Sequence, residues 1–229
     1  MFQFKQFLIL QDHCAQKVSE VACIQGAWTK LNDHCKHVLD IGSGTGLLSL
    51  MIAQRYDILI DAIEIDEATY NQGKENIDRS PFKHRIQCLL GDIKNFDLKT
   101  KYDFVITNPP FFEKQLQGPN DKANLAKHSS QLKLDELLDA IDKVLDDEGG
   151  FSILFPFDRK IELEQQSARL GYYASSYLIL KHSALHEPKV FIGLFSKQQN
   201  EIVIENLVIK ENGIYTERMK ELMSEYYLK

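Results

Sequence analysis

Three glycines at every second position follow an aspartate in the segment Asp40-Ile-Gly42-Ser-Gly44-Thr-Gly46. Glycines let a chain turn tightly and bring its backbone close to a ligand, and free N–H groups at the start of a following helix can bind a polar group. A dinucleotide loop has its third glycine at the sixth position, where this chain has Leu47. An acid ahead of the loop would repel a pyrophosphate but suits a cofactor with an α-amino group. The spacing therefore favours S-adenosylmethionine over NAD, with Asp40, Gly42, Gly44 and Gly46 as cofactor-binding residues.

Two further carboxylates follow the next two predicted strands. Glu64 stands at the end of the first, where a carboxylate can accept hydrogen bonds from both hydroxyls of a ribose. Asp92 follows the second, and its carboxylate could accept the exocyclic amine of an adenine. Taken alone, Glu64 could be a helix cap or a solvent-facing acid and Asp92 a turn residue, and Asp66 is interpreted as a helix cap. Because they occur in series, Glu64 and Asp92 are predicted to bind the cofactor.

A fourth predicted strand ends in Thr107-Asn108-Pro109-Pro110-Phe111. The two prolines hold φ near −65° and place Asn108 at the carboxyl end of the strand, where open α/β sheets bind ligands. The Asn108 amide oxygen and the Pro109 carbonyl can both accept hydrogen bonds from one NH₂ group. An amine conjugated to a ring is a poor nucleophile, and two acceptors on its hydrogens favour a nitrogen whose lone pair points at a methyl donor. Phe111 could stack on the target ring.

Short apolar runs alternate with segments of helical period from about residue 36 onwards, which predicts a parallel sheet covered on both faces. The amphipathic helix that starts at residue 134 is expected to end at Gly149-Gly150. Strands are expected at 36–41, 58–65, 85–90, 102–107 and 151–155, and the other helices at 46–55 and 67–79.

The last third of the chain has a different pattern. Strands 174–181 and 190–197 are joined by a loop too short for a crossover helix, so they are expected to pair antiparallel. Segment 201–210 is β-rich, and 216–227 is expected to be a helix. We expect one α/β, Rossmann-like domain with a mostly parallel seven-stranded sheet, an antiparallel edge strand and helices on both faces. Its parts would be an N-terminal extension (1–35), the core (36–197) and C-terminal strands with a helix (198–229).

Composition excludes several other classes of protein. The 229 residues carry a net charge of −6, and residues 135–148 alone account for −6, so the remainder is neutral. Such a chain does not coat nucleic acid non-specifically, although a local basic patch remains possible. No apolar run reaches the length of a membrane helix, and no signal peptide is recognised. The four cysteines have no zinc-like spacing, so we expect no metal and a reduced, cytoplasmic setting.

These motifs resemble the class I S-adenosylmethionine-dependent methyltransferases that act on amines. Segments 4–7 (FKQF), 11–18 (QDHCAQKV), 26–28 (GAW) and 126–128 (AKH) also resemble the bacterial valine-tRNA N6-adenine methyltransferase family over nearly the whole chain. The resemblance implies methylation of N6 of adenosine 37 in a valine tRNA, with S-adenosylhomocysteine as product and Lys17 as a further cofactor contact. Where that family reads Lys-Val-Gly-Thr-Asp-Gly, this chain reads Lys17-Val-Ser-Glu-Val-Ala22, a departure near the expected methionine end of the cofactor.

Other functions share parts of this pattern. Guanine N2 methylation of ribosomal RNA and glutamine N5 methylation of a protein use similar acceptor geometry, but the families that carry them out have a longer N-terminal domain. A non-catalytic cofactor-binding protein on the same fold is a second alternative, and an NAD oxidoreductase is a more distant one. We expect a monomeric enzyme that acts on tRNA, with Asn108, Pro109 and Phe111 as its catalytic residues.

Overall fold

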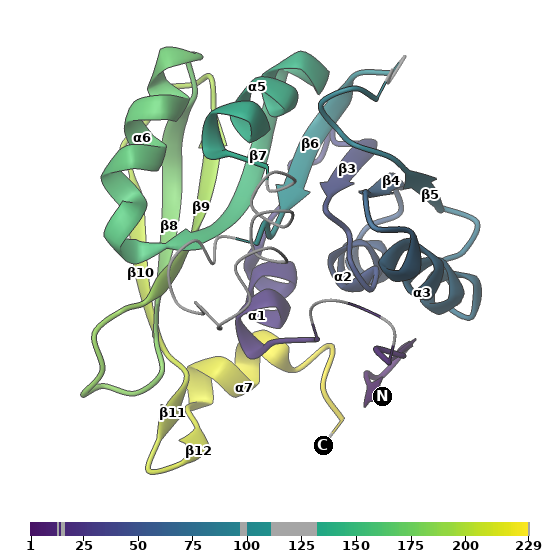
Figure 1. Ribbon diagram of the computed structural model, residues 1–229. Coiled ribbons are helices and arrows are strands. Elements are labelled where there is room, and N and C mark those ends of the chain that lie inside the picture. Colours follow the sequence, from purple (N-terminus) through teal and green to yellow (C-terminus); the bar gives the residue numbers. More distant parts are fainter. Residues whose placement is uncertain (13, 15–16, 97–99, 111–131, 229) are drawn as a thin grey trace, which may run out of the picture.

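The main sheet is mostly parallel, as expected. The structure is a computed structural model that describes residues 1–12, 14, 17–96, 100–110 and 132–228. In that part of the chain the sheet has eight strands, in the spatial order β10 (Val203–Val208), β8 (Tyr173–Lys181), β9 (Val190–Ser196), β7 (Leu145–Pro156), β6 (Tyr102–Thr107), β3 (His37–Ile41), β4 (Leu59–Glu64) and β5 (Ile86–Leu90) (Figure 1). Strands β5, β4, β3, β6 and β7 pair in parallel, so their carboxyl ends meet at one edge.

The α/β, Rossmann-like fold class is confirmed, and the sheet differs from the expectation in two details. The antiparallel strand β9 does not lie at the edge but between β7 and β8, and it is antiparallel to both. The short loop after β8 forces β9 to return beside it, as the sequence predicted. The long connection from β7 to β8, with η1 (Phe157–Arg159) and α6 (Lys160–Arg169), leaves the place next to β7 open for β9. The predicted number of seven strands is one too low, because β10 pairs in parallel with β8 and forms the outer edge.

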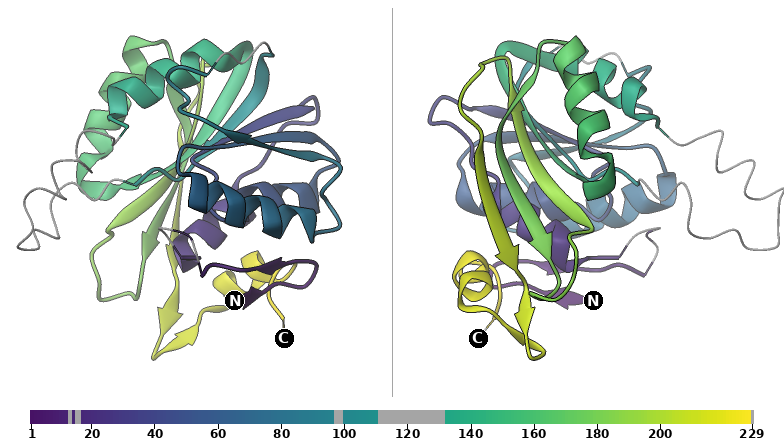
Figure 2. Two further views of the ribbon diagram at one scale, coloured as in Figure 1. Left: turned by 45° about the vertical axis from the view of Figure 1, so that its right-hand side comes forward. Right: turned by 90° about the vertical axis from the view of Figure 1, so that its left-hand side faces the viewer.

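Helices cover both faces of the sheet (Figure 2). Helices α1 (Glu20–Trp28), α2 (Leu47–Arg55), α3 (Glu67–Asp78) and α7 (Glu217–Met223) contribute to one hydrophobic cluster, and α5 (Leu134–Val144) and α6 to the other. Neighbouring strand residues divide between the two clusters, because successive side chains of a strand point to opposite faces. In β3, for example, Val38 belongs to the first cluster and Leu39 to the second. This double burial explains the uninterrupted apolar runs of the sequence.

Helix α5 ends earlier than predicted. It stops at Val144, and β7 begins at once with Leu145, which pairs with Tyr102 of β6. Gly150 therefore does not terminate a helix. It lies in β7, where an added Cβ atom would come within 2.8 Å of the Phe195 carbonyl oxygen, so close packing against β9 requires a glycine there. The helix predicted for 216–227 is also shorter, since α7 ends at Met223.

The two ends of the chain pack together (Figure 2). The hairpin of β1 (Phe2–Gln3) and β2 (Leu8–Ile9) lies beside the segment after α7, and the amide of Lys5 donates to the carbonyl of Tyr226 over 2.8 Å. A second hairpin, β11 (Lys210–Glu211) and β12 (Ile214–Tyr215), precedes α7. In the ranges that the structure describes, no helix is both long and apolar enough to span a bilayer.

Candidate active site

Four of the predicted site segments converge at the carboxyl edge of the parallel strands. The glycine loop follows β3, Glu64 is the last residue of β4, Asp92 follows β5 and Asn108 follows β6. The strand order β6-β3-β4-β5 places these segments side by side. This is the edge at which open α/β sheets bind ligands.

The glycine loop adopts a conformation that other residues rarely adopt. Gly42, Gly44 and Gly46 have φ values of 69°, 57° and 78°. The amide groups of Gly42 and Ser43 both donate to the Ile63 carbonyl, which ties the loop to β4. A Cβ atom added at Gly42 would meet nothing within 4 Å, and one at Gly44 would meet only a loop carbonyl at 3.9 Å. Backbone conformation rather than crowding therefore requires these two glycines, and the space above them is open to a ligand.

Helix α3 supports the loop through Gly73, which sequence reasoning missed. A Cβ atom on Gly73 would lie 2.5 Å from the carbonyl oxygen of Gly44. A glycine in the middle of a predicted helix was the available signal, because glycine costs helix stability and needs a reason to be there.

Replacing Gly73 by alanine is expected to push the glycine loop outwards and to weaken S-adenosylhomocysteine binding about tenfold, since overpacking costs about 1–3 kcal/mol. Isothermal calorimetry checks this result. The matched control is Lys74→Ala on the exposed side of the same helix, which should leave the affinity unchanged. Equal affinities for the two variants would contradict the proposed contact.

Asp40 is fully buried below the loop. Its Oδ2 accepts hydrogen bonds from the Ser49 amide (3.1 Å) and the Ser49 hydroxyl (2.6 Å). Its Oδ1 is buried and has no hydrogen-bond partner among the described residues. Burial raises the pKa of this carboxyl group from 3.8 to about 7, against the opposing effect of Ser49. An unpartnered, buried carboxylate oxygen is the acceptor that the ammonium group of a methionine moiety requires.

Glu64 holds the glycine loop from the other side. Its Oε2 accepts the Gly44 amide at 3.0 Å, and its Oε1 accepts the amides of Ile65 and Asp66. These contacts place the carboxylate at the carboxyl edge, where its remaining lone pairs can accept ribose hydroxyls. Asp66 is the N-cap of α3, as predicted, and its hydrogen bond with Thr69 lowers its pKa.

Two apolar side chains beside Glu64 were not identified from the sequence. Ile65 is 58% exposed and Leu90, the partner of Glu64 in the β4–β5 ladder, is 42% exposed. Exposed apolar side chains next to a carboxylate that is predicted to bind a ribose would suit the faces of an adenine ring. Asp92 lies nearby in a turn, where its Oδ1 accepts the Lys94 amide at 3.0 Å and its Oδ2 lies 3.8 Å from the Lys94 ammonium.

Asn108 directly follows Thr107, which pairs with β3 and β7 and is fixed on both sides. The Thr107 hydroxyl donates to the Ile41 carbonyl at 2.9 Å, and the Thr107 carbonyl accepts from the buried side chain of Gln25 at 2.9 Å. Pro109 is buried and Pro110 is exposed. Phe111 lies outside the described residues, so its predicted stacking position is not tested by the structure.

The N-terminal segment that departs from the family pattern has structural partners of its own. Ser19 caps α1 by accepting the Ala22 amide, and Glu20 pairs with the Lys210 ammonium at 2.8 Å and accepts the Tyr215 hydroxyl. Glu20 therefore docks α1 on the C-terminal hairpin, and Ser19 stabilises the start of the helix. Lys17 is exposed, and its predicted contact with the cofactor is not tested by the structure.

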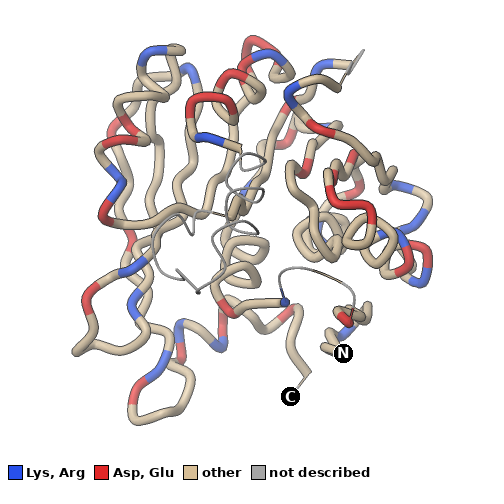
Figure 3. Tube along the Cα trace, viewed as in Figure 1, with Lys and Arg blue, Asp and Glu red and all other residues tan. Residues whose placement is uncertain are grey.

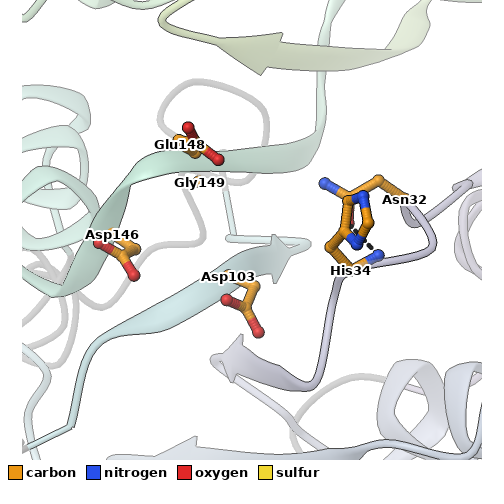
Figure 4. A pocket seen from close by; sticks show the side chains of 6 residues that line it. All are labelled: Asn32, His34, Asp103, Asp146, Glu148 and Gly149. Atoms are coloured by element: carbon orange, nitrogen blue, oxygen red, sulfur yellow. Dashed lines mark hydrogen bonds between the residues drawn. The ribbon is translucent and has the colours of Figure 1, made fainter.

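A pocket lies at the opposite edge, at the amino ends of β3, β6 and β7 (Figure 4). Asp103 in its wall accepts the amides of Lys36 and His37, which is a structural role. Its other lining residues are Asn32, His34, Asp146, Glu148 and Gly149. Acidic residues are distributed along the length of α5 (Figure 3), and Glu136 in its first turn lies 3.7 Å from the Lys94 ammonium, near Asp92 at the carboxyl edge. In the described part of the chain, no three His, Cys, Asp or Glu side chains are grouped to hold a metal ion.

Comparisons with known proteins define the class first. The family model "Methyltransferase small domain" matches residues 28–136. The fold is similar to that of a predicted O-methyltransferase from Agrobacterium tumefaciens, with a TM-score of 0.68 and 14% identity over 89% of this chain and 95% of that one. It is also similar to the glycopeptide N-methyltransferase MtfA in complex with S-adenosyl-L-methionine, with a TM-score of 0.59 and 9% identity over 83% of this chain and 100% of that one. The fold is that of a class I methyltransferase.

Full-length relatives identify the family. A protein from Dyadobacter fermentans is 40% identical and covers 100% of this chain and 97% of its own length. One from Phocaeicola vulgatus is 35% identical and covers 99% of this chain and 97% of its own length. Both are named tRNA1(Val) (adenine(37)-N6)-methyltransferase. The chain belongs to this family, which confirms the resemblance found in the sequence.

Proposed function

We propose that this chain transfers a methyl group from S-adenosylmethionine to the N6 amine of an adenosine in tRNA, at position 37 of a valine tRNA. The observation that carries this proposal is the convergence of the glycine loop, Glu64, Asp92 and Asn108 at one edge of the sheet, in a chain 40% identical over its whole length to a protein named for this reaction. Asp146 and Glu148 at the start of β7 line the pocket at the opposite edge, so these two acids do not repel an RNA bound at the carboxyl edge.

The residues at the carboxyl edge fit this cofactor. The unpartnered Oδ1 of Asp40 would accept the ammonium group of the methionine moiety, and the open face above Gly42 and Gly44 would receive its backbone. Glu64 would accept the ribose hydroxyls, and Asp92 the adenine amine. Gly46 opens helix α2, and Lys17 is proposed to contact the methionine carboxylate. S-Adenosylmethionine, when bound, supplies an activated methyl group on its sulfonium centre.

Asn108 and Pro109 would orient the adenine amine that receives the methyl group. The Asn108 amide oxygen and the Pro109 carbonyl accept the two hydrogens of the adenine amine and turn its lone pair towards the methyl carbon. With the cofactor bound, the amine nitrogen would take the methyl group from the sulfonium sulfur and would then release one proton to solvent. No strong base is needed, because the proton leaves after the new bond has formed. Phe111 is proposed to stack on the adenine, which must be turned out of the anticodon loop at a cost of about a few kcal/mol.

We further propose that the chain works as a cytoplasmic monomer and as one domain, with the parts 1–35, 36–197 and 198–229. Phe4, Met51 and Met219 come one from each part and share a single hydrophobic cluster, which supports the one-domain organisation.

Transfer of labelled methyl groups to unmodified bulk tRNA, with ribosomal RNA and total protein in parallel, tests the function. We expect label in tRNA that nucleoside analysis identifies as N6-methyladenosine, and none in a valine tRNA transcript with guanosine at position 37. Label in ribosomal RNA or protein would keep the chemistry and overturn the substrate. No transfer to any of them, with cofactor bound, would favour a non-catalytic cofactor-binding protein.

A further inference from the structure

One face of helix α3 forms the floor of the glycine loop. Gly73, Asn76 and Ile77 are spaced so that they share this face. Gly73 lies against the Gly44 carbonyl, and a Cβ atom on Gly46 would come within 3.0 Å of the Ile77 side chain. The Asn76 side chain reaches the loop between these two contacts, where its Nδ2 donates to the Thr45 carbonyl at 2.9 Å.

The same amide also binds the N-terminal segment. Its Oδ1 accepts the Leu10 amide at 2.8 Å, and its Nδ2 donates a second hydrogen bond to the Leu10 carbonyl at 2.9 Å. Asn76 is 1% exposed, and both hydrogens of its NH₂ group and its oxygen are used. Because Leu10 and Thr45 are far apart in sequence, the Asn76 side chain directly connects the N-terminal segment to the glycine loop.

We infer that Asn76 is a positioning residue that couples the N-terminal segment to the glycine loop, so that cofactor affinity depends on the hydrogen bonds between Asn76 and Leu10. The inference rests on the proposed cofactor. Its physical basis is that the two donated hydrogen bonds share one NH₂ group. A shift of the Thr45 carbonyl therefore moves the amide that holds Leu10, and an ordered Leu10 in turn fixes the loop.

The Asn76→Asp variant tests this coupling because it replaces the donating NH₂ group of the side chain by an oxygen and keeps the shape of the side chain. The introduced carboxyl group would lie at a position that is 1% exposed, and burial there raises its pKa well above the ordinary value. When ionised, it accepts the Leu10 amide but repels the carbonyls of Leu10 and Thr45, whereas the protonated group donates to one of them. We expect S-adenosylhomocysteine affinity about tenfold weaker than in the wild type at pH 8, equivalent to about 1.4 kcal/mol, with most of the deficit recovered at pH 6. Calorimetry gives the ratio of variant to wild-type dissociation constants at each pH, and the ratio removes the pH dependence that the wild type itself shows.

Asn71→Asp is the matched control, since Asn71 lies on the exposed face of the same helix and receives the same change. Its ratio of dissociation constants should stay near one at every pH. Equal, pH-independent ratios for the two variants would overturn the coupling, because a role confined to fold stability predicts no recovery at low pH.

Hydrogen exchange at the Leu10 amide gives a second readout. We expect S-adenosylhomocysteine to slow this exchange in the wild type and to slow it much less in Asn76→Asp at pH 8. An unchanged Leu10 exchange rate in the wild type would overturn the inference alone. A wild type that does not bind S-adenosylhomocysteine would overturn the proposed cofactor and this inference together, so the two failures are distinguishable.

Discussion

Replacing Asn108 by alanine is expected to lower the rate of methyl transfer by about 10²–10³-fold, the usual effect of removing an oriented group that stabilises the transition state. The backbone should remain in place, because Thr107 is held by its ladder partners, by the Ile41 carbonyl and by Gln25. Cofactor affinity should change less than about twofold, since Asn108 is not among the proposed cofactor ligands. Single-turnover transfer to unmodified valine tRNA and calorimetry with S-adenosylhomocysteine separate the two effects.

Asn206→Ala is a suitable control for this substitution, because Asn206 is exposed on the outer strand β10 and should affect neither quantity. An Asn108→Ala variant that loses cofactor affinity and transfer in equal measure would show that Asn108 is structural. A variant with wild-type transfer would remove it from the mechanism.

Replacing Asp40 by asparagine is expected to weaken cofactor binding by about tenfold or more and to stabilise the unliganded protein at pH 8. The first effect follows from the loss of a charged acceptor for the ammonium group. The second follows from linkage. The pKa of Asp40 in the folded protein is about 7, above its ordinary value of 3.8, so the folded state binds its proton more tightly than the unfolded state does.

The sign of the pH dependence follows from this difference. Asp40 lowers the wild-type stability progressively as the pH rises from about 4 to about 7, and the full cost remains above pH 7. Asparagine keeps an acceptor for Ser49 and carries no charge, so the melting temperature of the variant at pH 8 should exceed that of the wild type by about 2–6 °C. The gain should shrink as the pH is lowered towards 4.

Melting curves without cofactor between pH 4 and pH 8, together with calorimetry, measure both effects of Asp40→Asn. Wild-type cofactor affinity should fall as the pH drops through 7, because Asp40 takes up a proton, and the variant should lack this dependence. Asp33→Asn, at an exposed position, provides a control of equal charge change. A variant that is less stable than the wild type at pH 8 would contradict the buried-charge argument.

The position of the glycine loop could be predicted from the sequence because its signal is local. Left-handed φ values at alternate positions are sterically open to glycine and rarely to other residues, so the spacing of Gly42, Gly44 and Gly46 directly reports the backbone conformation. The end of β6 was likewise predictable, since two prolines cannot continue a central strand. The burial of Asp40 and its unpartnered oxygen could not be read in this way, because they depend on how α2 packs over β3.

The residues that support the site through contacts distant in sequence could not be identified from a local sequence pattern of this kind. Gly73, Asn76 and Gln25 act through contacts with residues 29, 31 and 82 positions away in the chain. A lone asparagine or glutamine inside a helix has no distinctive pattern, and a glycine inside a helix indicates a close contact without indicating its partner. The end of α5 was misjudged for a related reason. Gly150 is required by the carbonyl of Phe195 across the sheet, a contact that exists only after β9 has paired with β7.

By itself, the sequence determined the alternation of strands and helices, the loop that turns at the end of β3 and the Asn-Pro-Pro segment at which β6 ends. Each of these depends on the conformational preferences of a few adjacent residues. Only the tertiary structure decided that β9 lies between β7 and β8, that β10 extends the sheet and that α3 joins the N-terminal segment to the glycine loop. These features depend on which surfaces pack together, and packing is settled by the fit of whole elements rather than by the preferences of any one segment.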